Sequence, residues 1–431
     1  MSRRRLIAIT TALLIGVAVA AIWTWTRKSA RARGPLRQEA YLWQRAWRDP
    51  VRASLSEANS VFPSVCVLAA EIAWDQRQPK LARVGVDYAA IRRADMGMGV
   101  ALRVGVYSGP FEAESPGARF VIETAESIVR EAAAAETKLT ELQIDFDCPT
   151  SKLEGYRLLL EAIRRRVSPV PVTITVLPTW LKSPSFPALA RASDGFVLQV
   201  HSLVRPTGVD AALALCDPKL ARESVEMAGR MGVPFRVALP TYGYLVAFDA
   251  KDRFIGLSAE GPAGSWPPDA RTRRVAADPA ALAGLVQDWL ADRPINLKGI
   301  IWYRLPVSSD TMNWRWATLK SVMAGRAPKP ELRIRIKKEE PGLYGVELVN
   351  AGDNDASLRA KARLCWDGAE LIAADALEGF ETVAADHAIV FRSDRAAPLR
   401  YLAPGEHRPI GWVRLNRDKE VQAHVSDAND K

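Results

Sequence analysis

Residues Glu141–Pro149 read ELQIDFDCP, the segment from which the architecture of this chain is most readily inferred. Its apolar residues predict a buried strand. Because successive side chains of a strand point to opposite faces, Gln143, Asp145 and Asp147 share one face. A carboxylate in an apolar interior costs free energy unless it is paired or hydrated, so this face predicts a functional site. The alternative is that Asp145 is structural and bonds an Arg of a neighbouring strand.

A helix is expected directly after this strand. Ser151 and Glu154 have the spacing of a capping box. Apolar residues then recur at helical spacing; they are Leu153, Tyr156, Leu160 and Ile163. Asp147 therefore lies where a strand passes into a helix.

The same strand and helix pair recurs eight times between residue 40 and about residue 320. The predicted strands cover residues 41–47, 65–73, 99–106, 142–147, 171–177, 195–201, 234–242 and 298–305. The predicted helices cover residues 50–58, 86–94, 118–135, 152–166, 188–192, 218–231, 279–289 and 316–323. Asp217-Pro218 and Asp278-Pro279 are typical helix starts. Most strands are continuous apolar runs, as in parallel sheets covered on both faces. The chain is therefore predicted to form an α/β fold, a (β/α)8 TIM barrel over residues 34–325.

Two further regions follow from composition. Residues 245–277 are a long insert after Tyr244. The turn at Asp249 to Asp252 between apolar runs predicts a hairpin. This hairpin is expected to form a wall or lid at the carboxyl-terminal rim of the barrel. After a linker at residues 326–331, residues 332–431 alternate apolar and polar positions with period two. This pattern predicts a small all-β sandwich of immunoglobulin type. Its role is expected to be structural, with sugar binding by Trp366 or Trp412 as the alternative.

The chain begins with a membrane-directed segment at residues 1–33. Residues Leu6 to Trp25 carry no charge over twenty positions, enough for a helix to cross a bilayer. Ala18 to Ala20 offer a cleavage site, whereas Trp23 and Trp25 suit a membrane interface, and we favour a retained anchor. The folded part is then expected to be exported to the cell envelope and tethered to the inner membrane, or secreted if the segment is cleaved.

Composition excludes several classes of function. The 431 residues carry a formal charge of +10, but much of the excess lies in basic clusters around the apolar segment, so nucleic acid is not expected as a partner. Four widely spaced cysteines exclude a disulfide scaffold. Two alternatives remain for Cys148 and Cys216: they form a disulfide, or they are two inert thiols. No nucleophile elbow or phosphate loop is present.

The central and later parts of the barrel resemble chitinase-like glycoside hydrolases of family 18. Asp145 and Asp147 are in register with the second and third Asp of that family's DxxDxDxE motif, Tyr242 belongs to a matching seventh-strand segment, and the eighth strand ends with a Trp, here Trp302. Pro149 stands where the family has its catalytic Glu. The whole set of segments, including YLWQRAW and LPTYGYL, also resembles a bacterial envelope family known only as a domain of unknown function.

The predicted strand ends bring carboxylates, bases and aromatic residues to one rim, a composition typical of sugar sites. The expected sugar-binding residues are Gln199, His201, Tyr242, Trp302, Arg304 and Trp180, with Arg103 nearby and Tyr244 and Trp266 extending the aromatic platform. Each single Trp has the alternative of a core position.

Glycoside hydrolysis requires an acid and a second group at the anomeric carbon. We assign the anionic role to Asp147, assign to Asp145 the tuning of its pKa, and expect Glu71 to replace the missing acid. His201 is the only histidine of the barrel, so neither a His-rich metal site nor any cofactor is expected. His201 is expected to act as a base or as a hydrogen-bond donor to the sugar. The alternative is a structural histidine that bonds Asp145 or Gln199.

The sequence thus predicts a barrel that hydrolyses or binds an envelope or extracellular polysaccharide. Two alternatives remain. An inactive barrel that binds a glycan or takes part in envelope assembly predicts that Arg236 or Arg304 locks the two aspartates. A purely structural component predicts that the 245–277 insert plugs the rim.

Overall fold

The computed structural model describes residues 30–75, 78–202, 205–258, 266–385, 388–394 and 400–427. The apolar segment Leu6–Trp25 lies outside these residues. Among the helices that the structure describes, none has the length and apolar character needed to span a bilayer. The chain forms two compact units, one of residues up to Ala277 with Gln287–Asn313, the other of Asp278–Val286 with Trp314 onward.

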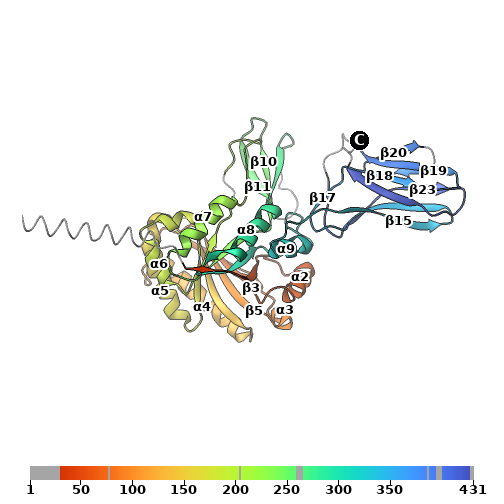
Figure 1. The fold of residues 1–431 in the computed structure, drawn as a ribbon. Helices are drawn as coiled ribbons and strands as arrows, with labels where there is room; N and C mark the ends of the chain where they lie inside the picture. Colours follow the sequence, from red (N-terminus) through yellow and green to blue (C-terminus); the bar gives the residue numbers. More distant parts are fainter. Residues whose placement is uncertain are drawn as a thin grey trace, which may run out of the picture. The chain divides into compact units, whose positions relative to one another are not determined.

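The first unit contains a closed barrel of eight parallel strands (Figure 1). In barrel order these are β2 (Arg37–Leu42), β3 (Ser64–Asp75), β5 (Gly97–Val104), β6 (Leu139–Phe146), β7 (Val172–Val176), β8 (Phe196–Gln199), β9 (Phe235–Pro240) and β14 (Leu297–Tyr303). Pairing of β14 with β2 closes the ring. The predicted (β/α)8 fold is confirmed, and seven of the eight strands lie near their predicted residues.

The first barrel strand is displaced from its prediction. It was expected at residues 41–47 and lies at Arg37–Leu42. Trp43 and Trp47 are buried, but they follow the strand in a loop. Their apolar character reflects packing of that loop, which period-two reasoning does not separate from strand burial.

The helices follow the strands in the predicted order. They are α2 (Asp49–Asn59), α3 (Tyr88–Ala94), α4 (Pro116–Ala134), α5 (Leu153–Val167), α6 (Phe186–Ala192), α7 (Pro218–Gly229), α8 (Pro279–Ala291) and α9 (Trp316–Met323). Asp217 and Asp278 cap their helices by accepting bonds from backbone N–H groups, as predicted. The capping box at Ser151 is wrong. A short 3-10 helix, η1 (Thr150–Lys152), precedes α5, and Glu154 bonds Arg157 instead.

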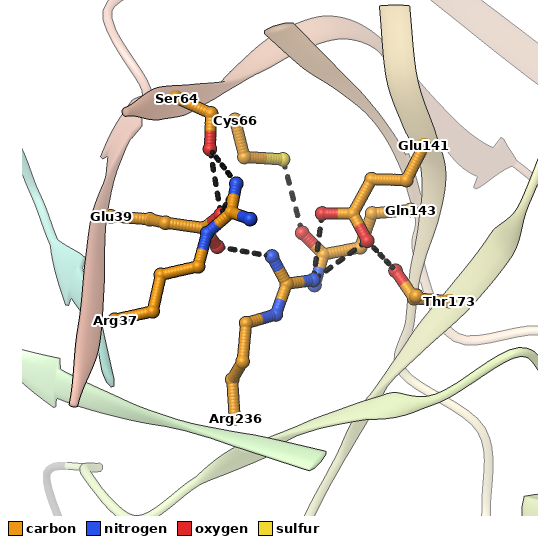
Figure 2. Close-up of polar contacts among 8 residues, drawn as sticks. All are labelled: Arg37, Glu39, Ser64, Cys66, Glu141, Gln143, Thr173 and Arg236. Carbon is orange, nitrogen blue, oxygen red and sulfur yellow. Dashed lines mark hydrogen bonds and ion pairs between the residues drawn. The ribbon is translucent and has the colours of Figure 1, made fainter. Parts of the chain in front are cut away.

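A charged network fills the amino-terminal end of the barrel (Figure 2). Arg236 reaches from β9 to Glu39 of β2 and to both oxygens of Glu141 of β6. Ser64 donates to Glu39 at 2.6 Å, and Thr173 donates to Glu141 at 2.8 Å. The barrel floor is therefore closed by paired charges, and Arg236 lies at the end opposite to the strand ends that were expected to carry the site.

The insert after the seventh strand forms its own antiparallel sheet. Its strands are β10 (Gly243–Phe248), β11 (Phe254–Ser258) and β12 (Arg271–Ala276), with β10 in the centre. Asp249 accepts bonds from the backbone of Lys251 and Arg253 in the β10–β11 turn, which confirms the predicted hairpin. Three short additions were not predicted: β1 (Arg31–Ala32) pairs with β13 (Arg293–Pro294), and β4 (Gln78–Arg83) pairs with β3.

The second unit contains the predicted all-β sandwich. One sheet has the order β15 (Leu332–Glu340), β16 (Leu343–Asn350), β23 (His407–Leu415), β19 (Leu371–Ala376). The other has the order β20 (Phe380–Ala385), β21 (Ala388–Ser393), β18 (Ala360–Cys365), β24 (Gln422–Asp427). A short pair, β17 (Ala356–Ser357) with β22 (Tyr401–Leu402), lies beside them. Alternate residues such as Tyr344, Val346 and Leu348 form the shared core.

Candidate functional site

A cavity of about 230 Å³ opens at the carboxyl-terminal ends of the barrel strands, the end where barrels of this class carry their sites. It is lined by Tyr41, Trp43, Arg103, Asp145, Thr175, Gln199, His201, Ser202, Ala238, Tyr242, Tyr244 and Tyr303. We call it the mouth pocket. The insert contributes Tyr244 of β10 to its wall, and the described residues of the insert leave the pocket open.

Strand register positions the charged groups. Glu71 of β3 is paired with Arg103 of β5, which is paired in turn with Asp145 of β6. Asp145 lies in the mouth pocket and accepts a hydrogen bond of 2.6 Å from the hydroxyl of Thr175. Burial raises the pKa of the Asp145 carboxyl, and the nearby Asp147 and Glu71 raise it further. The Thr175 hydrogen bond and the Arg103 charge lower this pKa but do not outweigh burial. Asp145 therefore keeps its proton to a higher pH than an ordinary Asp.

Asp147 and Glu71 are not among the residues that line the pocket, and each is paired with an arginine. Asp147 is exposed, and one of its oxygens lies 3.2 Å from the Arg103 guanidinium. Glu71 accepts two bonds from Arg45, of 2.6 and 2.9 Å. Of the three carboxylates predicted from the sequence, the structure places Asp145 in the mouth pocket and the other two beside it.

Aromatic rings form the rest of the wall. Tyr303 is in edge contact with Tyr41, Trp43 and Tyr242, with ring centres 5.7, 5.5 and 5.4 Å apart. The ring of Tyr244 lies edge-on to that of Tyr242 at 5.1 Å. Burial raises the pKa of Tyr303 and of Tyr242, so both hydroxyls stay protonated at neutral pH. The pocket is thus an aromatic cup with a carboxyl group in its wall.

His201 is a buried, neutral member of this cup. Its ring stacks on Tyr303, and its Nδ1 atom lies 3.4 Å from the Tyr242 hydroxyl. Burial lowers the pKa of His201 to about 3. Among the described residues, the His201 side chain does not form the expected hydrogen bond to Asp145 or Gln199. The Gln199 amide instead donates to the His201 backbone carbonyl at 3.2 Å.

The hydroxyl group of Tyr41 is buried and has no hydrogen-bond partner among the described residues. The side chain is only 3% exposed, and it lines the mouth pocket. A buried polar group without a partner costs about 1–3 kcal/mol.

Three residues predicted to bind sugar lie elsewhere. Trp302 faces outward from the barrel, because Ile301 and Tyr303 on either side of it face inward, and its Nε1 donates to Gln38 at 2.9 Å. Arg304 is 2% exposed and forms an ion pair with Asp310. Trp180 is buried in edge contact with Tyr156.

The other tryptophans considered from the sequence are also outside the mouth pocket. Trp266 packs against Gly256 of the insert. Trp366 is buried in the sandwich core and donates to the Ala369 carbonyl, so it does not offer a binding face. Trp412 is half-buried and lines a separate cavity of about 610 Å³ on the sandwich.

Sequence reasoning missed Tyr41, Trp43, Thr175 and Tyr303. The signal that identifies Tyr303 and Thr175 was present in the period-two alternation. Inward positions of β6 are the odd-numbered residues up to Asp145, and parallel register carries the same face to Thr175. On β14 the alternation selects Tyr303 and rejects Trp302. The preference for a Trp came from the family resemblance.

The remaining polar groups do not form a recognisable cation site. Within the residues that the structure describes, no cluster of three or more His, Cys, Asp or Glu side chains could hold a metal ion. Cys66, Cys148, Cys216 and Cys365 are all free thiols. The pairing of Cys148 with Cys216 is therefore not formed in this structure.

Two family models match the chain. Residues 114–308 match a domain of unknown function, DUF3142, and residues 334–416 match a second, DUF8456. The expected resemblance to a domain of unknown function is thereby confirmed. A search of curated protein sequences gave no match.

Similar solved structures include two spore cortex-lytic enzymes SleL. That of Bacillus megaterium QM B1551 is 13% identical with a TM-score of 0.47, over 64% of this chain and 72% of that one. That of Bacillus cereus is 11% identical with a TM-score of 0.48, over 68% and 75%. A chitinase from Chromobacterium violaceum ATCC 12472 is 16% identical with a TM-score of 0.44, over 67% and 99%.

Proposed function

We propose that the mouth pocket binds one sugar residue of a glycan and that Asp145 is the proton donor in cleavage of its glycosidic bond. The observation that carries this proposal is a carboxyl group with a raised pKa in an aromatic cup that also contains the unpartnered Tyr41 hydroxyl. Sugar rings have apolar faces that pack on aromatic side chains and hydroxyl groups that need directed partners.

The chemistry assigns roles that differ from those expected from the sequence. A glycosidase acid needs a pKa raised by its surroundings, and Asp145 has one. It transfers its proton to the glycosidic oxygen as that oxygen leaves the anomeric carbon. A water molecule then adds its hydroxyl group to this carbon and returns its other proton to the Asp145 carboxylate. The Asp147 side chain, 3.2 Å from the Arg103 guanidinium, supplies negative charge near the developing cation.

A binding-only barrel is the second candidate, and one observation favours it. Asp145 is the single carboxylate among the described residues of the pocket lining, whereas most glycosidases use two. In the part of the chain that the structure describes, the two arginines named by this alternative pair with other carboxylates. Arg236 pairs with the floor carboxylates Glu39 and Glu141, and Arg304 pairs with Asp310.

An envelope or extracellular polysaccharide is the substrate class that we propose. It rests on the apolar segment Leu6–Trp25, which would hold the folded part at the outer side of the inner membrane. If the segment is cleaved, the same pocket would act in secreted form.

The test is a glycan-array binding assay on the full chain in lipid nanodiscs, with reducing-end release measured on every hit. Wild type is compared with Asp145→Asn and Asp147→Asn. Binding by all three proteins with release lost in Asp145→Asn supports the hydrolase. Binding without release by wild type supports the binding-only barrel, and failure of wild type to bind any glycan contradicts both.

A further inference from the structure

A second cavity, of about 570 Å³, lies beside the mouth pocket. We call it the side groove. Its walls come from the segment at η2 (Pro178–Lys182), from the end of β8, and from α7 with the loop before it. Its apolar lining residues are Leu177, Pro178, Val200, Ala214, Leu215, Leu220 and Met227. The volume lies within the range of small-molecule sites, about 300–1,000 Å³.

The side groove and the mouth pocket share a wall. Gln199, His201 and Ser202 line both cavities. The backbone N–H of Ser202 donates to the Leu215 carbonyl at 2.9 Å, which ties this wall to the loop before α7. A molecule seated in the mouth pocket therefore needs to extend past only one short segment to reach the groove.

Helix α7 presents two apolar side chains to the groove. Leu220 and Met227 line it at the i and i+7 positions of the helix, with Glu223 and Ser224 between them. Leu220 is 58% exposed and Leu177 is 36% exposed, although both border a cavity that would bury them when filled. The groove thus offers apolar surface beside a pocket lined largely by polar and aromatic groups.

We infer that the site takes an amphiphilic glycan, with a sugar residue in the mouth pocket and an alkyl or acyl chain attached to that sugar in the side groove. This inference rests on the proposed glycan binding and names the substrate class of the same site. The shared wall joins the two cavities, and their opposite polarity matches the two halves of such a molecule. Burial of the chain is driven by the hydrophobic effect, with up to about a fourfold gain in affinity for each buried methylene.

The test measures the affinity of the full chain in lipid nanodiscs for ethyl, butyl, hexyl and octyl glycosides of the sugar that binds best. Affinity is expected to rise with chain length in wild type. In Leu220→Asp the rise is expected to be largely lost, while the ethyl glycoside still binds as in wild type. Leu158→Asp is the matched control, because Leu158 is 42% exposed on α5 and outside the groove. Partitioning into the disc is the same for all three proteins.

The outcomes separate two claims, the binding of an alkyl chain in the side groove and the binding of sugar in the mouth pocket. Equal affinity for all chain lengths in wild type contradicts the groove assignment and leaves sugar binding intact. A rise that persists in Leu220→Asp also contradicts it. If alkyl alcohols without a sugar bind as tightly as the glycosides, the groove does not act together with the mouth pocket. If the ethyl glycoside and free sugar both fail to bind, the proposed function itself fails.

Discussion

At the scale of single residues, the mouth pocket is defined by groups whose surroundings change their chemistry. Asp145 has a raised pKa because it is buried, and His201 is neutral for the same reason. Tyr41 has a hydroxyl group without a partner. In the proposed function, these groups meet a neutral, polyhydroxylated ligand.

Tyr41→Phe tests the role of the unpartnered hydroxyl. The substitution removes a buried group that has no partner, so the free energy of unfolding of the ligand-free chain is expected to stay the same or rise. Sugar binding is expected to weaken about 2- to 10-fold, because a ligand hydrogen bond is lost. Thermal unfolding and calorimetric titration measure the two effects.

Tyr344→Phe is the control for this substitution. The Tyr344 hydroxyl donates to the Lys419 carbonyl at 2.8 Å, so its removal is expected to cost about 1 kcal/mol of stability and to leave sugar binding unchanged. A loss of stability in Tyr41→Phe equal to that in Tyr344→Phe would contradict the assignment of Tyr41.

The pH dependence of hydrolysis is expected to follow Asp145. Activity requires its protonated form, so the rate is expected to fall as pH rises through the raised pKa of Asp145. Asp145→Asn is expected to lower the rate at least about 100-fold and to keep binding. Because the pKa of His201 is about 3, the rate is not expected to report a titration of His201 between pH 5 and 8. A rate that increases with a midpoint near pH 6.5 would assign the chemistry to another group.

At the scale of elements, the barrel strands carry different chemistry at their two ends. The inward face of β6 begins with Glu141 in the charged floor, passes Gln143, and ends with Asp145 in the mouth pocket. The floor holds β2, β6 and β9 together through Arg236 (Figure 2). The floor is thus a stabilising feature, separate from the site.

Arg236→Ala is expected to destabilise the barrel by about 3–5 kcal/mol, because it leaves the buried Glu141 without its arginine and Glu39 with Arg37 alone. Arg222→Ala is the control, since the Arg222–Asp288 pair is exposed and is expected to contribute less than about 1 kcal/mol. Chemical denaturation measures both. Equal effects of the two substitutions would show that the floor network does not stabilise the fold.

The floor also predicts the response to acid. Burial acts to raise the pKa of Glu39, but Arg236, Ser64 and Arg37 outweigh it, so the pKa is lowered. The resulting stability is present above the ordinary pKa of a Glu and is lost as pH falls through the lowered value. Wild type is therefore expected to lose stability below about pH 4.5 more steeply than Arg236→Met.

The elements were predicted better than the site. Continuous apolar runs and helical periodicity located the eight strands and their helices, because burial in a barrel imposes those patterns locally. The side chains that form the pocket depend on which face of each strand turns inward and on what each charge meets in space. Trp302 and Arg304 were expected in the site and lie outside it, whereas Tyr303 between them lines it.

At the scale of the whole molecule, the described residues form two units with separate cores. The barrel carries the mouth pocket and the side groove, and the sandwich has its own core around Phe391 and Val413. The second family model, over residues 334–416, lies within the sandwich unit.

The proposed membrane anchor at Leu6–Trp25 yields a prediction for the intact protein. We expect the full chain to sediment with membranes and to resist extraction by high salt, because twenty uncharged residues suffice to span a bilayer. A chain that begins at residue 30 is expected in the soluble fraction. Release of the full chain by salt alone, or sedimentation of the shortened chain, would contradict retention through this segment.

The most direct test of the central claim is a crystal structure of the chain with the tightest-binding glycan from the array. The account predicts a sugar ring packed on Tyr303 and Trp43, with one of its hydroxyl groups bonded to Tyr41 and the glycosidic oxygen within reach of Asp145. A glycan bound outside the mouth pocket, with Tyr41 still unpartnered, would contradict it.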